Sequence, residues 1–278
     1  VLYVSEQLNV EVYWGLSLSG FALALIGFFD DLLNIPARWR IFSHFAIVSW
    51  FLFWTDELAF IELIGIKGDL GWGGNVLTAF FLVWMLNLYN FMDGIDGLAG
   101  VETITSTGTV TLIAMFIIDI SWELPLILML STLGFLFWNW PPARVFMGDV
   151  GSGFLGFNLG ALALIHGKEA PELFWCWIIL LGVFITDSTI TLIRRIIRIQ
   201  PFYKAHRCHG YQYASRLFSS HIKVTIGVFT INLFWLLPWA LAVSSHWVDP
   251  LLGLFVSYLP LVVLAFIFKA GAADLQEV

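Results

Sequence analysis

Apolar stretches long enough to cross a membrane follow one another through most of this 278-residue chain, and they constrain its fold more than any other feature. The sequence is 59% hydrophobic and 12% charged, with a mean hydropathy of +0.87. A soluble domain cannot hide so much apolar surface, so most of it must face lipid. The sequence therefore predicts an all-α, polytopic membrane helical bundle, with residues 1–278 forming a single transmembrane domain.

The apolar runs and the polar gaps between them predict nine membrane-spanning helices, since a helix needs about 20 residues to cross the hydrocarbon core. The second run is short, and it either continues past Asp56 and Glu57 or lies partly in the interface. The chain starts at Val1, without Met and close to an apolar run, so we expect a piece of a longer protein. The expected spans are about residues 13–29, 41–55, 74–92, 98–118, 124–140, 151–166, 173–193, 224–243 and 250–268.

The positions of Lys and Arg predict the orientation of these helices. If the loop after the first span is cytoplasmic, eleven of the 13 basic residues fall on that side, which agrees with the positive-inside rule. Only Lys67 and Lys168 then lie outside. The eleven are Arg38, Arg40, Arg144, Arg194, Arg195, Arg198, Lys204, Arg207, Arg216, Lys223 and Lys269.

The first polar motif is the acidic pair Asp30 and Asp31 at the end of the first span. Two adjacent carboxylates repel each other and raise each other's pKa unless a cation or a proton relieves them. A functional pair would therefore have a cation or a proton beside it. An ordinary charged stop at the membrane interface explains it equally well.

The second motif places two amides and two carboxylates within ten residues, at Asn87, Asn90, Asp93 and Asp96. Asn87 and Asn90 are three residues apart and share a helix face. Gly94 and Gly97 end that helix, so the oxygen ligands lie beside the start of the next one, which suits a divalent cation and a phosphate. A simple turn would explain the glycines but not the four polar side chains.

The third motif runs from Asn139 through Phe146 to Asp149 and Ser152. Asp149 precedes a Gly-rich helix whose first N–H groups are unpaired and can face an anion. Taken alone, Asp149 is better explained as a helix cap, and the glycines by close helix packing in lipid.

The fourth motif lies in a basic loop, where His206, Arg207, His209, Tyr211 and Gln212 are close together. Basic residues in such loops usually bind anionic lipid, and we assign that role to Arg194, Arg195 and Arg198. The mixture of donors and titratable groups from His206 to Gln212 indicates a site instead. Asp187, inside the seventh span, is as well explained by structural pairing as by a direct role.

The predicted topology places all four motifs on the cytoplasmic side, and this convergence favours a metal-assisted phosphoryl-transfer enzyme. The alternative from another class is an ion-coupled transporter with a path through Asp187 and Asn90. A transporter of that kind should carry polar residues near the middle of several helices, whereas here they gather at one interface.

The motifs resemble those of the polyprenyl-phosphate N-acetylhexosamine-1-phosphate transferase superfamily. This superfamily includes bacterial enzymes that begin O-antigen and teichoic acid synthesis and the phospho-MurNAc-pentapeptide translocase. The resemblance runs from Asp30 to Arg216 and is most specific in Asn87-x-x-Asn90-x-x-Asp93-Gly-x-Asp96-Gly and in Phe146-Met-Gly-Asp149-x-Gly-Ser152. It implies that N-terminal spans of the family precede Val1. This chain departs from the family in two ways. Tyr211 and Gln212 stand where the enzymes that begin O-antigen and teichoic acid synthesis have further histidines, and the triple histidine of the translocase is absent.

The resemblance also implies the reaction and its components. A polyprenyl (undecaprenyl) phosphate would attack a UDP-N-acetylhexosamine at the cytoplasmic face of the inner (plasma) membrane, releasing UMP. The implied cofactor is Mg²⁺, with Mn²⁺ as its substitute. The expected partners are these two substrates and membrane lipids, with no nucleic acid, and a homodimer is left open. The implied residues are Asp30, Asp31, Asp149 and His209 as catalytic groups, Asn90 and Asp149 as metal ligands, and Asn87, Asp93, Asp96, Asn139, Phe146, His206 and Arg207 as substrate contacts.

Overall fold

The computed structural model describes residues 10–55, 72–200 and 206–272, and within these ranges the regular structure is helical, with no strand. Two helices contain a π-helical turn, η1 and η2. The elements are α1 (Val10–Leu33), α2 (Ala37–Trp54), α4 (Trp72–Met92), α5 (Leu98–Ile113), η1 (Ala114–Ile118), α6 (Glu123–Asn139), α7 (Gly148–Glu169), α8 (Pro171–Leu180), α9 (Gly182–Ile197), α10 (Gly210–Phe218), α11 (His221–Ile231), η2 (Asn232–Leu236), α12 (Leu237–Ser244) and α13 (Pro250–Ile267).

The all-helical class is confirmed, whereas the count of nine spans is not. Each expected span overlaps a helix, but among the described residues only six are long and apolar enough to cross a membrane. A seventh results if α8 and α9, which are bent by 68° at their junction, form one broken span. The helix α6 is shorter, with 17 residues, and α2, which carries Arg38, Arg40 and His44, is not among the six.

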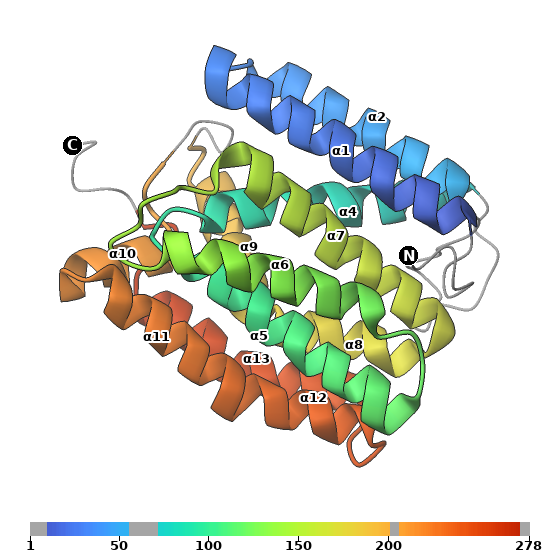
Figure 1. The fold of residues 1–278 in the computed structure, drawn as a ribbon. Coiled ribbons are helices and arrows are strands. Elements are labelled where there is room, and N and C mark those ends of the chain that lie inside the picture. The colour runs from blue at the N-terminus through green and yellow to red at the C-terminus, as the bar shows by residue number, and fades with distance from the viewer. Residues whose placement is uncertain (1–9, 56–71, 201–205, 273–278) are drawn as a thin grey trace.

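Helix α7 lies in the middle of the bundle, where it packs against α1, α4 and α8 (Figure 1). Of the most apolar 18-residue stretch of α7, 78% is buried inside the protein, against 22% for α13. Gly156 permits the close approach of α4, because a Cβ there would lie 2.6 Å from the carbonyl oxygen of Met85. Small residues at such crossings are how helices pack tightly in lipid.

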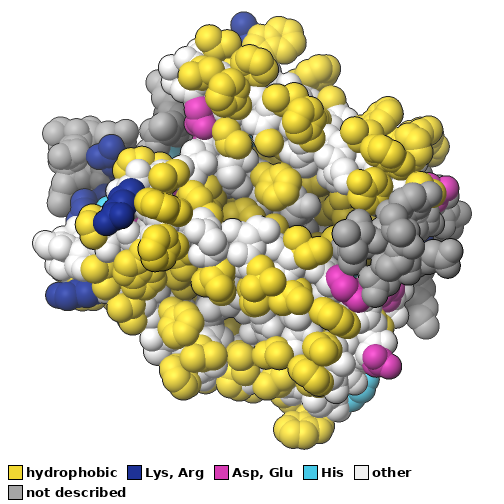
Figure 2. All heavy atoms as spheres, viewed as in Figure 1, with side chains coloured by type: hydrophobic (Ala, Val, Ile, Leu, Met, Phe, Trp, Pro, Cys, Tyr) yellow, Lys and Arg dark blue, Asp and Glu magenta, His cyan; other side chains and the backbone are white. Residues whose placement is uncertain are grey.

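The four polar motifs lie at the same end of the bundle, as the alternating topology predicts. The ends of α1 and α4 and the starts of α7 and α10 meet there (Figure 1). On the face drawn in Figure 2, hydrophobic side chains cover the middle, Lys and Arg gather toward the α10 end, and most acidic side chains lie at the opposite end. This arrangement fits a membrane protein with its basic loops on one side.

We expect single cysteines placed at Arg38, Arg144 and Ser219 to react with a membrane-impermeant maleimide only from the cytoplasm. A cysteine at Glu169 should react only from outside. All four positions are exposed, and the native Cys176 and Cys208 are buried, so background labelling should be low. Labelling in intact cells and in inverted vesicles measures the side. Reaction of Arg144→Cys from outside would contradict the shared cytoplasmic face.

Candidate functional site

A cluster of opposite charges joins the end of α1, the start of α2 and the start of α7. The guanidinium Nη1 of Arg40 donates to Asp30 Oδ2 at 2.8 Å and to Asp149 Oδ2 at 3.1 Å. Asp30 Oδ1 also accepts from the backbone N–H of Ile35 at 2.8 Å, which closes the turn between α1 and α2. One positive charge therefore bridges carboxylates from the first and third motifs.

Asp149 also joins the second motif to the third. Its Oδ1 accepts from the Nδ2 of Asn90 at 2.5 Å, and the same amide group donates to Ser152 Oγ at 3.1 Å. The backbone N–H of Asp149 donates to Asp31 Oδ1 at 3.2 Å. Gly148 makes this approach possible: its φ is +63°, and a Cβ there would lie 2.6 Å from Asp31 Oδ2. The expected proximity of Asp30, Asp31, Asn90 and Asp149 is thus observed.

Asp93 lies in the turn after α4, close to the same carboxylates. Burial raises its pKa to about 8, and the negative charges of Asp149, Asp31 and Asp96 act in the same direction. Gly97, with a φ of +76°, then caps the start of α5. The turn therefore concentrates acidic groups in a place where a cation or a proton is needed to balance them.

A cavity of about 640 Å³ opens beside this cluster and has two kinds of wall. One wall is apolar and includes Phe45, Phe80 and Trp84. Asn87 also lines the cavity, although its Nδ2 donates to the carbonyl of Val83 at 2.7 Å within α4. The polar lining consists of Arg40, Asn87, Asn90, Asp149, His206, His209, Tyr211 and Gln212.

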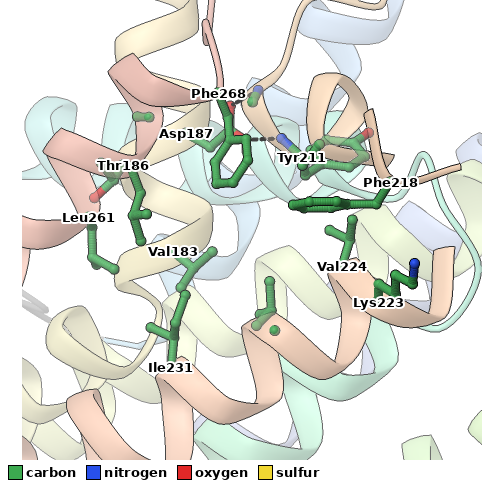
Figure 3. Close-up of a pocket in the computed structure, with 16 residues that line it drawn as sticks. Val183, Thr186, Asp187, Tyr211, Phe218, Lys223, Val224, Ile231, Leu261 and Phe268 are labelled. Atoms are coloured by element: carbon green, nitrogen blue, oxygen red, sulfur yellow. Dashed lines mark hydrogen bonds between the residues drawn. The ribbon is translucent and has the colours of Figure 1, made fainter. Parts of the chain in front are cut away.

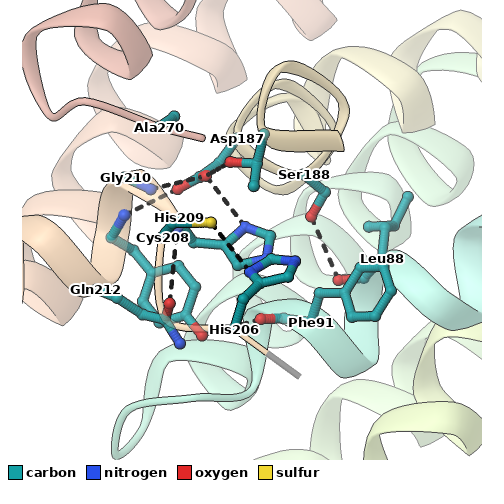
Figure 4. Close-up of polar contacts among 12 residues, drawn as sticks. Leu88, Phe91, Asp187, Ser188, His206, Cys208, His209, Gly210, Gln212 and Ala270 are labelled. Atoms are coloured by element: carbon teal, nitrogen blue, oxygen red, sulfur yellow. Dashed lines mark hydrogen bonds and ion pairs between the residues drawn. The ribbon is translucent and has the colours of Figure 1, made fainter. Parts of the chain in front are cut away.

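Asp187 anchors residues 206–212, here called the histidine segment, to α9, as Figure 4 shows. Its carboxylate accepts from His209 Nδ1 at 3.3 Å and from the backbone N–H groups of Gly210 and Tyr211 at 2.9 and 2.8 Å. The hydroxyl of Tyr211 donates to the carbonyl of Phe91 at 2.9 Å, which ties the segment to the end of α4. The structural pairing expected as one alternative for Asp187 is therefore present.

His206 and His209 stack with ring centroids 5.0 Å apart and planes inclined by 25°. Burial lowers the pKa of His206 to about 4, and the nearby positive charge of Arg195 adds to this effect. His206 is therefore neutral near pH 7, able to donate or accept a hydrogen bond but not to supply positive charge.

Asp96 and Asn139 lie in a different cluster and do not line the cavity. Asn139 Oδ1 accepts from the N–H of Gly97 at 2.9 Å, and Asp96 Oδ2 accepts from the N–H of Ala143 at 3.1 Å. His221 Nδ1 lies 3.3 Å from the same Asp96 oxygen. These contacts brace the 140–147 loop against the start of α5, so the implied substrate contacts of both residues stay a prediction.

Phe146 and Arg207 are exposed and also lie outside the cavity lining. The Phe146 side chain is 75% exposed, at the end of the loop that Asp96 and Asn139 brace. Arg207 contributes its backbone carbonyl to Arg216 at 3.0 Å. Their substrate contacts stay a prediction.

The sequence did not indicate Arg40 as a site residue, although Arg40 follows the acidic pair of the first motif closely. The short 34–36 connection after α1 was the available clue, because it turns α2 back along α1 and brings Arg40 beside Asp30. Ser152, although part of a recognised motif, was not expected to contact Asn90. No sequence pattern indicates that bond.

The carboxylates in this cluster are suitable ligands for Mg²⁺. Within residues 10–55, 72–200 and 206–272, no group of three His, Cys, Asp or Glu side chains could hold a metal ion by itself. Mg²⁺, however, usually binds through one or two carboxylates together with waters and substrate phosphates. The place where Arg40 bridges Asp30 and Asp149 shows that this part of the site needs positive charge, so the residues fit the ion.

Comparison with known proteins shows similarity over most of the chain. Residues 13–167 match a family model described as glycosyl transferase family 4. A probable undecaprenyl-phosphate N-acetylglucosaminyl 1-phosphate transferase of Bacillus subtilis is 29% identical over 78% of this chain and 62% of its own length. A phospho-N-acetylmuramoyl-pentapeptide-transferase of Buchnera aphidicola is 31% identical over 88% of this chain and 74% of its own. The chain thus spans less than two thirds of the first relative.

Proposed function

Since this chain belongs to glycosyl transferase family 4, we propose that it transfers an N-acetylhexosamine 1-phosphate from a UDP-sugar to a polyprenyl phosphate. The oxygen of the acceptor phosphate attacks the β-phosphorus of the donor. The bond from that phosphorus to the bridging oxygen breaks, and UMP leaves with the electron pair. The product is a lipid-linked sugar pyrophosphate that starts a cell-envelope glycan.

The observation that carries this proposal is the cavity of about 640 Å³, which joins a charged cluster to an apolar wall. Arg40, Asn90 and Asp149 lie at the charged part, and Phe45, Phe80 and Trp84 at the apolar part. An acceptor with a phosphate and a long hydrocarbon chain needs both surfaces. A water-soluble acceptor would not need the apolar wall.

The chain's own residues have distinct tasks in this proposal. Asp30 or Asp31 would accept the remaining proton of the acceptor phosphate, of which much is already ionised because its second pKa is about 6. Arg40 would offset negative charge on the phosphates once they enter, and His209 would donate to them from the opposite side. Attack by an Asp carboxylate to form a covalent intermediate is the competing route.

Asp149 and Asn90 would hold Mg²⁺, which when bound neutralises charge on the diphosphate and favours departure of UMP. The remaining contribution of the protein is positioning, because one phosphate linkage replaces another of similar charge.

Release of UMP by the full-length protein tests the proposal directly. Purified protein in detergent would receive undecaprenyl phosphate, Mg²⁺ and one UDP-sugar at a time, with omission of the lipid as the control. We expect UMP only when lipid, donor and Mg²⁺ are all present. UMP release that does not require the lipid would indicate a hydrolase instead.

A second candidate within the same family uses a UDP-MurNAc-pentapeptide as donor. It is favoured by the relative that is 31% identical, whose name specifies that activity. The same assay separates the two candidates, because only the donor differs. We further propose a cytoplasmic site in the plasma membrane and leave a homodimer as a prediction to be measured by light scattering.

Donor choice is expected to depend on Tyr211 and Gln212. Both line the cavity, and both donate hydrogen bonds without becoming cationic near neutral pH. Changing both to His should alter the ratio of kcat/KM between two UDP-N-acetylhexosamines about 10-fold, a typical effect of altered pocket contacts. Arg207→Ala should lower turnover with every donor alike. An unchanged ratio in the double variant, together with an altered ratio in Arg207→Ala, would reverse these roles.

A further inference from the structure

Asp187 is a buried carboxylate of α9 that does not itself line the large cavity, although two of its partners, His209 and Tyr211, do. Three donors converge on its Oδ1: His209 Nδ1, the Gly210 N–H and the hydroxyl of Thr191, at 3.3, 2.9 and 3.1 Å. The other oxygen, Oδ2, accepts from the Tyr211 N–H at 2.8 Å. Apart from the Thr191 hydroxyl, which belongs to α9 itself, these donors are the His209 ring and the first backbone N–H groups of α10.

The other side of Asp187 is apolar. It borders a cavity of about 150 Å³ between α9, α10, α11 and α13, lined by groups such as Val183, Phe218 and Leu261 (Figure 3). In surroundings of this kind a hydrogen bond is strong and an unpaired carboxylate is costly. The four donors therefore fix the carboxylate, and the carboxylate in turn fixes the donors.

The ring of His209 is also held from its faces. His206 stacks on it at 5.0 Å, and Phe91 lies 6.0 Å away with its plane inclined by 33°. Because Nδ1 donates to a carboxylate, it must carry a proton, and this determines which nitrogen is left for other partners. Nε2 is the nitrogen left for a ligand, and His209 is among the residues that line the large cavity.

We propose that Asp187 is a positioning residue: it keeps a proton on His209 Nδ1 and fixes the first turn of α10, so that Nε2 meets the reacting phosphates. This inference rests on the proposed sugar-phosphate transfer. It adds a residue that contacts no substrate but determines how His209 does.

Two substitutions at Asp187 separate positioning from charge. Asp187→Ala removes every acceptor, so His209 loses the partner of its Nδ1 proton. Asp187→Asn removes the charge, yet its carbonyl oxygen should occupy the Oδ1 place, where three donors converge, and leave only the Tyr211 N–H without its acceptor. Glu102→Ala is the matched control, because Glu102 is a fully buried carboxyl of α5 that accepts from Asn232 in η2, away from the hydrogen bonds of Asp187.

The readouts are steady-state UMP release, thermal unfolding and ¹⁵N NMR of histidine-labelled full-length protein, with His209→Gln used to assign the His209 signals. We expect a protonated Nδ1 in the wild type and in Asp187→Asn, and its loss in Asp187→Ala. For Asp187→Ala, kcat should fall about 100-fold with KM for the donor nearly unchanged, since loss of a partner that orients a histidine typically costs 10- to 100-fold. Asp187→Asn should lose less than about 10-fold, and Glu102→Ala should lower thermal stability while leaving the His209 signals and kcat as in the wild type.

An unprotonated Nδ1 in wild-type His209 would overturn the proposal even if no Asp187 variant folds. So would a folded Asp187→Ala protein that keeps wild-type kcat, or one whose loss of activity is matched by Glu102→Ala. If the wild type releases no UMP from any donor, the proposed reaction fails, whereas the ring-nitrogen spectra of wild type and variants still decide whether Asp187 sets the tautomer of His209.

Discussion

Asp149→Ala should reduce UMP release at least about 1000-fold, the upper part of the range for removing one group that stabilises charge in a transition state. Asp149 contacts Arg40, Asn90 and the segment that carries Asp31. Its loss removes the proposed Mg²⁺ ligand and leaves the Asn90 amide without its 2.5 Å acceptor. Turnover measured with saturating donor and lipid reports the effect.

The variant should still insert and fold, because α7 is held mainly by apolar contacts with α1 and α4. Glu172→Ala is a suitable control, since it removes an acidic group from the start of α8, at the opposite end of the bundle. It should keep wild-type turnover. Substantial Mg²⁺-dependent turnover in Asp149→Ala would remove Asp149 from the site.

Gly27→Ala is expected to have the second largest effect, although Gly27 carries no chemistry. A Cβ at this position would lie 2.5 Å from the backbone nitrogen of Val150 and 2.6 Å from the carbonyl oxygen of Asp149. Backbone atoms cannot rotate away, so α1 must shift from α7. Overpacking of this kind typically costs about 1–3 kcal/mol, and the shift would separate Asp30 and Asp31 from Asp149. We expect a lower unfolding temperature and a loss of UMP release of about 100-fold, comparable to misplacement of reacting groups by 1 Å.

Gly134→Ala is the matched control for this substitution. Gly134 lies within the helix α6, and an added Cβ there would meet nothing within 4 Å. Alanine is the better helix former by up to about 1 kcal/mol, so the unfolding temperature should stay the same or rise slightly. Wild-type stability in Gly27→Ala, measured in the same detergent, would show that α1 and α7 are not held as close as the structure indicates.

The helical class and the grouping of motifs at one end could be predicted from sequence because both have local causes. An apolar run of sufficient length forms a helix in lipid, where each backbone group must find its partner within the segment. Because successive spanning helices run in opposite directions, every second loop lies on the same side of the membrane. The doubtful second span shows the limit, since α2 combines apolar residues with Arg38, Arg40 and His44. The number of spans is not fixed by hydropathy there.

The pairing of residues within that end was determined only by tertiary packing. Asn90 and Asp149 are 59 residues apart, and Arg40 and Asp149 are 109 apart. Their contacts depend on how closely α1, α4 and α7 approach, which glycines at positions 27, 148 and 156 permit. A motif specifies which groups are available, but the separation between helices specifies which of them meet.

The same distinction explains the fates of the remaining polar residues. The sequence by itself determined that acidic, amide and histidine side chains would share one interface, because a bilayer excludes them from its apolar interior. Only the tertiary structure decided that Asp187 would hold His209, or that Asp96 and Asn139 would brace a loop rather than line the cavity. The physical reason is that a buried polar group must find a partner, and distance and direction in the folded protein determine which partner it finds.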